Sequence, residues 1–206
     1  MTNIELTKLA LDNARKSISK IDPKVLYDIT LPGQSMVSGM LPHLLNNLIT
    51  EKTRYLEIGT WKGTTAVSAL YNNSPAHVTI VDSWEPRFGP TTKQDFIDRC
   101  NKYLNYVPNF IHNDCFGFDP LEKGIHDINF YFYDGEHEYQ DHYKALTHYY
   151  ASLADEFILV VDDFNYEPVK PATMDAIRDK NIKVLYSEEL SPPDGTNGLY
   201  IAVCKK

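Results

Sequence analysis

Apolar residues in the first quarter of this chain recur at helical spacing. Residues 4–21 show one such pattern and residues 34–50 repeat it, so two amphipathic helices are expected here. Pro23 is predicted to break the chain between them, and Pro42 predicts a kink or a late start of the second helix. Residues 1–50 are therefore predicted to form a helical cap on the rest of the chain.

From Tyr55 onward, short apolar runs alternate with helix-like stretches. The predicted strands are Tyr55–Ile58, Val78–Val81, Asn109–Ile111, Ile128–Tyr133, Phe157–Val161, Ile182–Tyr186 and Leu199–Val203. The predicted helices are Thr64–Tyr71, Lys93–Leu104, Tyr139–Leu153 and Val169–Lys180. Because the runs are apolar on both faces, they favour an α/β fold with a parallel sheet between helices. Turn residues alone separate the last two runs, which should pair antiparallel as a hairpin and make the sheet mixed.

The composition is that of an ordinary globular domain. Of 206 residues, 43% are hydrophobic and 23% charged, which excludes disordered, collagenous and coiled-coil classes. The three cysteines form no CxxC pair, and the first 20 residues lack the apolar core of a secretory signal, so a reducing, cytoplasmic location is expected. No apolar run has the length of a membrane span. The net charge of −8 and the lack of a Lys/Arg run argue against nucleic acid or a membrane surface as partner.

Glycines follow the first predicted strand, at the sheet edge where α/β proteins bind ligands. Gly59 and Gly63 permit a tight turn and a close approach of the backbone to a ligand, although the loop matches neither GxGxxG nor a Walker loop. These residues are consistent with a nucleotide-binding loop and equally with a plain turn between a strand and a helix. Asp82 ends the second strand, where it either binds a ribose diol or caps the next turn. Together, the loop and the acid favour a cofactor that contains adenosine.

Two further residues are candidates for contacts with the adenine of such a cofactor. Trp84 either stacks on the base or packs within its loop. Asp114, after the third strand, either accepts a hydrogen bond from the adenine amine or caps a helix.

Acidic residues follow the fourth and fifth predicted strands. Asp134 comes after the fourth strand, and Asp162 and Asp163 come after the fifth. Three carboxylates at one edge would repel one another unless they shared a cation, and oxygen ligands suit Mg²⁺, Mn²⁺ or Ca²⁺. His137 lies three residues beyond Asp134, near a helix start. It is predicted either to act as a general base or to form a structural bond to a neighbouring carboxylate.

These segments, in this order, resemble a known family. LEIGTWKGTTA, the acid of IVDSW, HND, YDGEHEY and VVDDF are similar to class I S-adenosylmethionine-dependent methyltransferases over residues 34–206. The resemblance is closest to metal-dependent O-methyltransferases of the catechol and macrolide-sugar types. It implies a Rossmann-like, seven-stranded sheet in the order 3-2-1-4-5-7-6, with strand seven antiparallel and helices on both faces. It also implies that residues 51–206 form the cofactor-binding domain.

The resemblance also implies roles for individual residues. The implied cofactor contacts are Glu57, Gly59, Thr60, Gly63, Asp82, Ser83, Trp84, Asp114 and Asp134. The implied metal ligands are Asp134, Asp162 and Asp163, although the catechol type has Asp-Asn at the last two positions. His137 falls where the sugar type has a histidine base. Gly33–Met36 is similar to a segment that lines the methyl-transfer site, and residues 191–198 are expected to help wall the acceptor pocket.

The expected function is therefore methylation of a hydroxyl on a small molecule, with S-adenosylmethionine, a divalent metal such as Mg²⁺, and His137 as base. Three alternatives remain open. A non-catalytic member of the fold would not need Asp134, His137, Asp162 and Asp163 together. A nicotinamide-dependent oxidoreductase would need a GxGxxG loop, and a metal-dependent hydrolase leaves the glycine loop unexplained. The sequence leaves open the acceptor and the oligomeric state, a homo-oligomer included.

Overall fold

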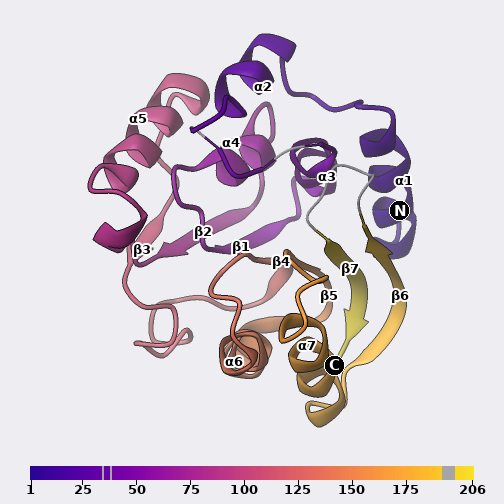
Figure 1. Cartoon of the computed structure of the whole chain (residues 1–206). Coiled ribbons are helices and arrows are strands. Elements are labelled where there is room, and N and C mark those ends of the chain that lie inside the picture. The colour runs from indigo at the N-terminus through magenta and orange to yellow at the C-terminus, as the bar shows by residue number, and fades with distance from the viewer. Residues whose placement is uncertain (34, 38, 192–197) are drawn as a thin grey trace.

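The computed structural model of the protein describes residues 1–33, 35–37, 39–191 and 198–206. Its strands form one mixed sheet in the order β3-β2-β1-β4-β5-β7-β6 (Figure 1). The strands are β1 Arg54–Ile58, β2 His77–Asp82, β3 Phe110–His112, β4 Ile128–Tyr133, β5 Leu153–Val161, β6 Lys183–Leu190 and β7 Leu199–Lys205. β7 runs antiparallel to β5 and β6, whereas the other neighbouring strands pair in parallel. This confirms the strand order and the C-terminal hairpin.

Helices cover both faces of the sheet, as predicted. They are α1 Asn3–Arg15, α2 Pro23–Ile29, α3 Leu41–Leu48, α4 Thr64–Leu70, α5 Thr92–Leu104, α6 Tyr139–Tyr149 and α7 Val169–Asp179. In Figure 1, α3 and α4 lie on one side of the sheet, whereas α6 and α7 pack together on the other. Every helix in the described part of the chain is too short or too polar to cross a lipid bilayer.

The central strands are apolar on both faces because two hydrophobic cores lie against them. In β4, Phe130 and Phe132 face the core that includes α1, α3, α4 and α5, and Tyr131 and Tyr133 face the core beneath α6 and α7. All four aromatic side chains are buried. Side chains on successive residues of a strand point to opposite faces, so a strand between two cores carries no polar alternation.

The N-terminal segment differs from its prediction in one helix. Residues 23–29 form α2, where the sequence predicted a break at Pro23. Proline lies in the first turn of this helix, where its missing N–H costs nothing, and the Asp22 carboxylate accepts a hydrogen bond from the Lys24 N–H at 2.8 Å. Pro42 likewise occupies the first turn of α3, which confirms the predicted late start.

The boundary between α6 and β5 also differs from its prediction. The helix ends at Tyr149, a 3-10 turn spans Tyr150–Ser152, and β5 begins at Leu153 rather than Phe157. The first part of this strand contains polar residues, so an apolar run does not predict it. Its Glu156 pairs with Lys205 of β7 in the antiparallel ladder.

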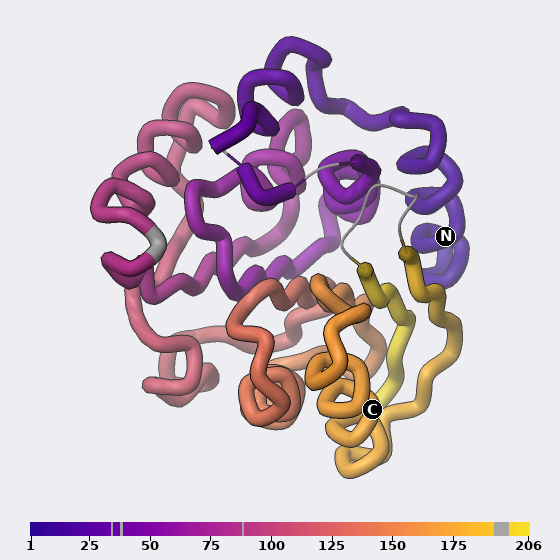
Figure 2. Tube along the Cα trace, viewed as in Figure 1, coloured from indigo at the N-terminus to yellow at the C-terminus, as the bar shows by residue number. Residues whose placement is uncertain are grey.

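Helix α1 lies alongside the edge strand β6, and the N-terminus is on this side of the molecule (Figure 2). Arg15 of α1 forms an ion pair with Glu188 of β6, and the Lys8 ammonium lies 5.1 Å from the ring centre of Tyr186. The apolar side chains of Ala10 and Leu11 are buried in the core shared with the sheet. Helix α1 therefore packs as part of the main body of the protein.

Candidate active site

A cavity of about 580 Å³ opens where the parallel strands end. Segments that follow β1, β2, β3 and β4 all contribute to its wall. Of the residues predicted from the sequence, those that line it are Gly59, Asp82, Ser83, Trp84, Asp114, Asp134 and His137. Met36 also lines it, whereas residue 34 of the Gly33–Met36 segment lies outside the described residues. Residues 192–197 of the expected acceptor wall lie outside them too.

Gly59, just after β1, lies against the backbone of Asp134, just after β4. Its φ is +81°, and a Cβ atom there would lie 1.8 Å from the Asp134 carbonyl oxygen. The Gly59 N–H donates to the Val81 carbonyl at 2.9 Å, and the Asp134 N–H donates to the Ile58 carbonyl at 2.9 Å. Only glycine fits this position, which fixes the turn after β1 directly against Asp134.

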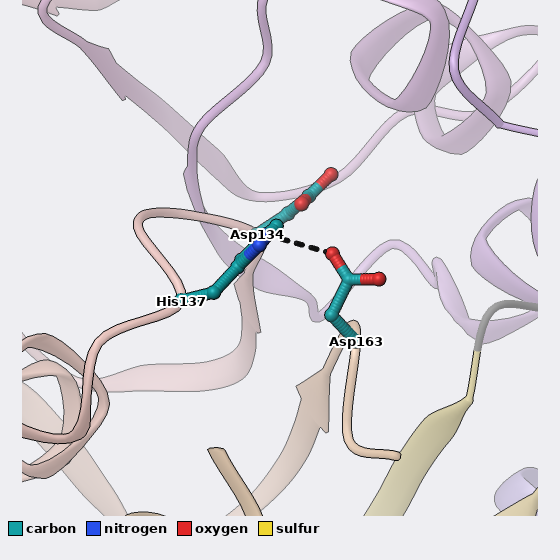
Figure 3. A group of neighbouring side chains, drawn as sticks. All are labelled: Asp134, His137 and Asp163. Carbon is teal, nitrogen blue, oxygen red and sulfur yellow. Dashed lines mark ion pairs between the residues drawn. The ribbon is translucent and has the colours of Figure 1, made fainter. Parts of the chain in front are cut away.

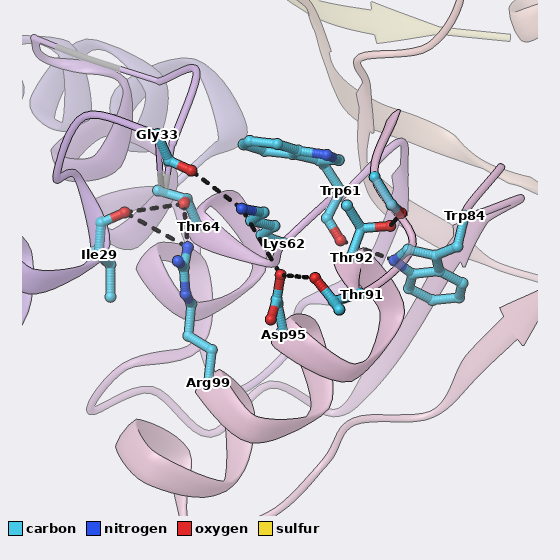
Figure 4. Close-up of polar contacts among 11 residues, drawn as sticks. Ile29, Gly33, Trp61, Lys62, Thr64, Trp84, Thr91, Thr92, Asp95 and Arg99 are labelled. Atoms are coloured by element: carbon cyan, nitrogen blue, oxygen red, sulfur yellow. Dashed lines mark hydrogen bonds and ion pairs between the residues drawn. The ribbon is translucent and has the colours of Figure 1, made fainter. Parts of the chain in front are cut away.

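The rest of the turn is held by contacts to the N-terminal segment and to α5. Gly63, with φ +81°, is the N-cap residue of α4 and lies against the Phe96 ring, so it is behind the cavity wall. The Lys62 ammonium donates to the Gly33 carbonyl at 3.0 Å and lies 3.7 Å from the Asp95 carboxylate (Figure 4). These contacts attach the turn to the helices on the same face of the sheet.

Asp82 joins the two loops that border the cavity. One carboxylate oxygen accepts the N–H groups of Thr60 at 2.9 Å and Trp61 at 2.8 Å, and the other accepts the Trp84 N–H at 2.6 Å. Burial raises the pKa of this carboxyl, and the three backbone hydrogen bonds oppose the rise. The capping interpretation is therefore confirmed, and the same carboxylate lines the cavity.

Trp84 is held in its loop by packing. Its side chain is 7% exposed, its ring centre lies 5.3 Å from that of Phe96, and its indole N–H donates to the Trp61 carbonyl at 2.8 Å (Figure 4). The Asp114 carboxylate accepts the Phe116 N–H at 2.9 Å and so caps a turn. Packing and capping thus account for both residues, and both also line the cavity.

Glu57 lies behind the cavity, in the interior of the sheet. Its carboxylate accepts hydrogen bonds from the hydroxyl groups of Tyr55, at 2.8 Å, and Thr65. Burial raises the pKa of Glu57 to about 7, against the effect of these hydroxyl groups. Thr60 is also buried and is not part of the cavity wall. Both residues therefore support the turn from below.

Asp134, His137 and Asp163 come together at the β4–β5 end of the cavity (Figure 3). Their potential ligand atoms all lie within 4.8 Å of one another, and His137 Nε2 is 2.8 Å from the Asp163 carboxylate. Asp163 has φ +53°. Asp162 lies outside this group, and its carboxylate accepts the Asp163 N–H at 3.0 Å. The structure thus brings together two of the predicted metal ligands and the predicted base.

The charges at this end favour a bound cation. Burial, with the carboxylates of Asp162 and Asp163 next in effect, raises the pKa of Asp134 well above its usual range. Burial and the neighbouring Asp163 raise the pKa of Asp162 to about 6. The hydrogen bond to Asp163 raises the pKa of His137. A protonated histidine, a metal ion or a cationic ligand would relieve this repulsion.

Two contacts between loops around the site could not be predicted from the sequence. Arg87, in the 3-10 turn Pro86–Phe88, pairs with Glu136 beside His137 and with Glu85 at 2.8 Å. Tyr166, after β5, places its ring centre 5.2 Å from that of His137. Each contact joins segments far apart in the chain, where no short motif records the pairing.

Comparison with known proteins identifies the class to which this fold and site belong. A family model described as a methyltransferase domain matches residues 56–164, which is more than half of the chain. The chain therefore belongs to this methyltransferase family, as the resemblance in its sequence implied. The matched span contains the glycine turn, Asp82, Asp134, His137 and Asp163.

Solved structures share the fold at low sequence identity. An O-methyltransferase from Bacillus cereus in complex with S-adenosylhomocysteine gives a TM-score of 0.68 at 13% identity, covering 99% of this chain and 100% of that one. A protein from Corynebacterium glutamicum gives 0.62 at 18%, covering 94% of each. TrmK from M. capricolum, also with S-adenosylhomocysteine, gives 0.57 at 16%, covering 80% of this chain and 67% of that one. No curated protein sequence matches the chain significantly.

Proposed function

We propose that this protein transfers the methyl group of S-adenosylmethionine to a hydroxyl group of a small molecule. The observation that carries the proposal is one continuous cavity with two differently built ends. Asp82 and the glycine turn border one end, and Asp134 and His137 border the other, so a cofactor and an acceptor can be held side by side.

The cavity has the size and charge for this cofactor. Its volume of about 580 Å³ is typical of small-molecule sites. The Gly59 backbone offers a close approach at the turn, and the carboxylates of Asp82 and Asp134 complement a ligand with positive charge on its sulfonium and amino groups. When bound, S-adenosylmethionine supplies an activated methyl group. The B. cereus and M. capricolum proteins, crystallised with S-adenosylhomocysteine, support this choice by analogy of fold.

His137 is proposed to accept the hydroxyl proton of the acceptor. With Nε2 donating to Asp163, the lone pair of the neutral ring is on Nδ1, and the proton goes to this atom. The Asp163 carboxylate then stabilises the charged ring. General base catalysis of this kind typically contributes ~10²–10⁴-fold in rate. Because Asp163 raises the pKa of His137, the rate should increase with pH as the ring loses its proton.

The same group of residues fits a divalent metal ion. Asp134 and Asp163 would hold the ion with His137 beside them, and Asp162 would add negative charge nearby. Carboxylate oxygens suit Mg²⁺ or Mn²⁺. Bound there, the ion would lower the pKa of the acceptor hydroxyl and orient its oxygen.

A small uncharged or cationic acceptor suits the surroundings better than nucleic acid does. The chain has a net charge of −8, and the carboxylates that line the cavity, Glu85 and Glu136 among them, outnumber the cations Arg87 and Lys144. Polyanions need positive surfaces, because most of their binding energy comes from contacts to phosphate.

The experiment is a methyl-transfer assay with radiolabelled S-adenosylmethionine and a panel of catechols, sugars and nucleotide sugars, with Mg²⁺ or with a chelator. For the acceptor that reacts, His137→Ala should lower kcat ~10²–10⁴-fold. Its affinity for the cofactor should stay within a few-fold of the wild type. His126→Ala is the control, because His126 is exposed and contacts Asp127. A wild-type rate for His137→Ala would contradict the role of the base.

A further inference from the structure

A second, smaller cavity lies beside the candidate active site. It has a volume of about 310 Å³ and is bordered by the segment after β5, the start of α7 and the facing ends of β6 and β7. The residues that matter for what it can hold are Phe164, Tyr166, Glu167, Lys170, Glu189 and Leu190. We refer to this space as the side cavity.

Tyr166 lines the side cavity and lies next to His137, which lines the main cavity. Its side chain is half exposed, lines the side cavity, and lies with its ring centre 5.2 Å from that of His137. The Tyr166 N–H donates to the Asp163 carbonyl at 2.9 Å, which fixes its backbone next to the proposed base. A ligand with one group at His137 therefore has the Tyr166 ring and the side cavity directly beside it.

The inner wall of the side cavity is firm and apolar. Phe164 and Leu190 are each 3% exposed. The Phe164 ring stacks on that of Tyr200, with ring centres 4.6 Å apart and an angle of 16° between the planes. Such a wall takes a flat or alicyclic ring, because ring faces bury apolar area without requiring hydrogen bonds.

The charges around the side cavity disfavour an anion. The Lys170 ammonium donates to both carboxylate oxygens of Glu189, at 2.9 and 2.7 Å, so this pair is neutral overall. Glu167 adds a negative charge to the wall. A carboxylate or phosphate bound in the side cavity would face this like charge.

We propose that the side cavity binds the ring end of the methyl acceptor, and that this acceptor carries no negative charge. The proposal rests on the proposed function, because it places the hydroxyl to be methylated at His137. It adds a substrate class: ring compounds that are neutral or carry an amine, to the exclusion of phosphorylated acceptors such as nucleotide sugars. Tyr166 is then a specificity-determining residue.

The test is an amide NMR titration of the ¹⁵N-labelled protein with three small probes of matched size. Benzyl alcohol is neutral, benzylamine is a cation and benzoate is an anion. Benzyl alcohol and benzylamine should shift the amide signals of Asn165, Tyr166 and Gly198 in a saturable way. Benzoate should leave these signals unchanged at the same concentrations.

Two tyrosine variants locate the binding. Tyr166→Ala should weaken binding of benzyl alcohol about five- to tenfold, because one aromatic wall is lost. Tyr27→Ala is the matched control, since Tyr27 is also exposed but belongs to α2 and does not line the side cavity. It should leave the affinity unchanged.

Saturable benzoate binding at these amides, or equal affinity of wild type and Tyr166→Ala, would overturn the proposal. So would the absence of any saturable shift from all three probes. Failure of the proposed function gives a different result, because a separate titration with S-adenosylmethionine would then leave the amides of Gly59 and Asp82 unshifted.

Discussion

The two ends of the candidate active-site cavity hold their carboxylates differently. At the β1–β2 end, Asp82 accepts three backbone N–H groups, and Glu57, which lies behind the cavity wall, accepts two hydroxyl groups. At the β4–β5 end, Asp134 and Asp163 face His137, a group that can itself gain or lose a proton. The donors of the first arrangement are held in place by the fold. The second arrangement contains a histidine whose protonation can change when a ligand or a metal ion binds.

Under the proposed function, this difference separates cofactor binding from the chemical step. A carboxylate with fixed donors keeps its position whether or not a ligand is bound, which pre-organises the site. Carboxylates crowded around an imidazole instead change their protonation when a cation or a proton arrives. Substitutions at the β1–β2 end, the fixed end, should therefore lower the stability of the fold. Substitutions at the β4–β5 end, the responsive end, should change how the protein responds to metal ions and pH.

The largest effect is expected at the fixed end, from Gly59→Ala. The left-handed backbone costs an alanine ~1–2 kcal/mol. The clash with the Asp134 carbonyl adds ~1–3 kcal/mol, as overpacking does elsewhere. Urea unfolding should show a loss of about 3 kcal/mol or more.

Gly124→Ala separates these two causes. Gly124 has φ +75°, but a Cβ atom there would meet nothing within 4 Å. The Gly124→Ala variant should lose only the cost of the left-handed backbone, ~1–2 kcal/mol of unfolding free energy. Equal losses of unfolding free energy in the two variants would show that the Asp134 carbonyl leaves room for a Cβ atom at Gly59.

The next effect is the pH dependence contributed by Glu57. The pKa of Glu57 is raised to about 7 in the folded protein. Glu57 therefore stabilises the folded protein below its ordinary pKa, and this stabilisation is lost as the pH rises through 7. In Glu57→Gln no carboxyl titrates at this position, so this loss of stability does not occur. The variant should therefore gain stability relative to wild type between pH 5 and pH 8, by up to about 3 kcal/mol at about 1.4 kcal/mol per pKa unit.

Urea unfolding at several pH values measures this effect. Glu122→Gln, which changes an exposed carboxylate, is the control and should follow the wild-type profile. A constant stability difference between Glu57→Gln and wild type from pH 5 to pH 8 would mean that Glu57 keeps its charge throughout, held by Tyr55 and Thr65.

A smaller effect is expected at the responsive end, from metal ions. Mn²⁺ or Mg²⁺ at about 100 times its Kd should stabilise the protein by about 2.7 kcal/mol. This corresponds to a rise in Tm of roughly 5–10 °C for a chain of this size. Asp163→Asn should abolish the rise, whereas Asp12→Asn, which changes an exposed side chain of α1, should keep it. A Tm indifferent to both ions in the wild type would remove the metal from the proposed function.

Much of the fold could be predicted because its signals are local. Phe130–Tyr133 is apolar at every position, as a strand between two cores must be. The order of the strands came from the family resemblance rather than from spacing. Helix α2 is harder to predict, because Pro23 has the pattern of a chain break, although proline is favoured in a first turn after a capping residue such as Asp22.

The site could be predicted only as far as strand ends define it. Parallel strands end at one edge, which places Asp134 near Asp163. Which carboxylate of the Asp162–Asp163 pair meets His137 depends on local backbone conformation, here φ +53° at Asp163, and no residue pattern reports this angle. The contact of Tyr166 with His137 depends on the same turn.

The central claim is that the fixed end of the cavity binds S-adenosylmethionine. Isothermal titration of the wild type tests it most directly, with Asp82→Ala as the variant and with S-adenosylhomocysteine and NAD as further ligands. We predict micromolar binding of S-adenosylmethionine and S-adenosylhomocysteine, weaker binding of both to Asp82→Ala, and no heat with NAD. No heat with S-adenosylmethionine or S-adenosylhomocysteine, together with clear binding of NAD, would contradict the account.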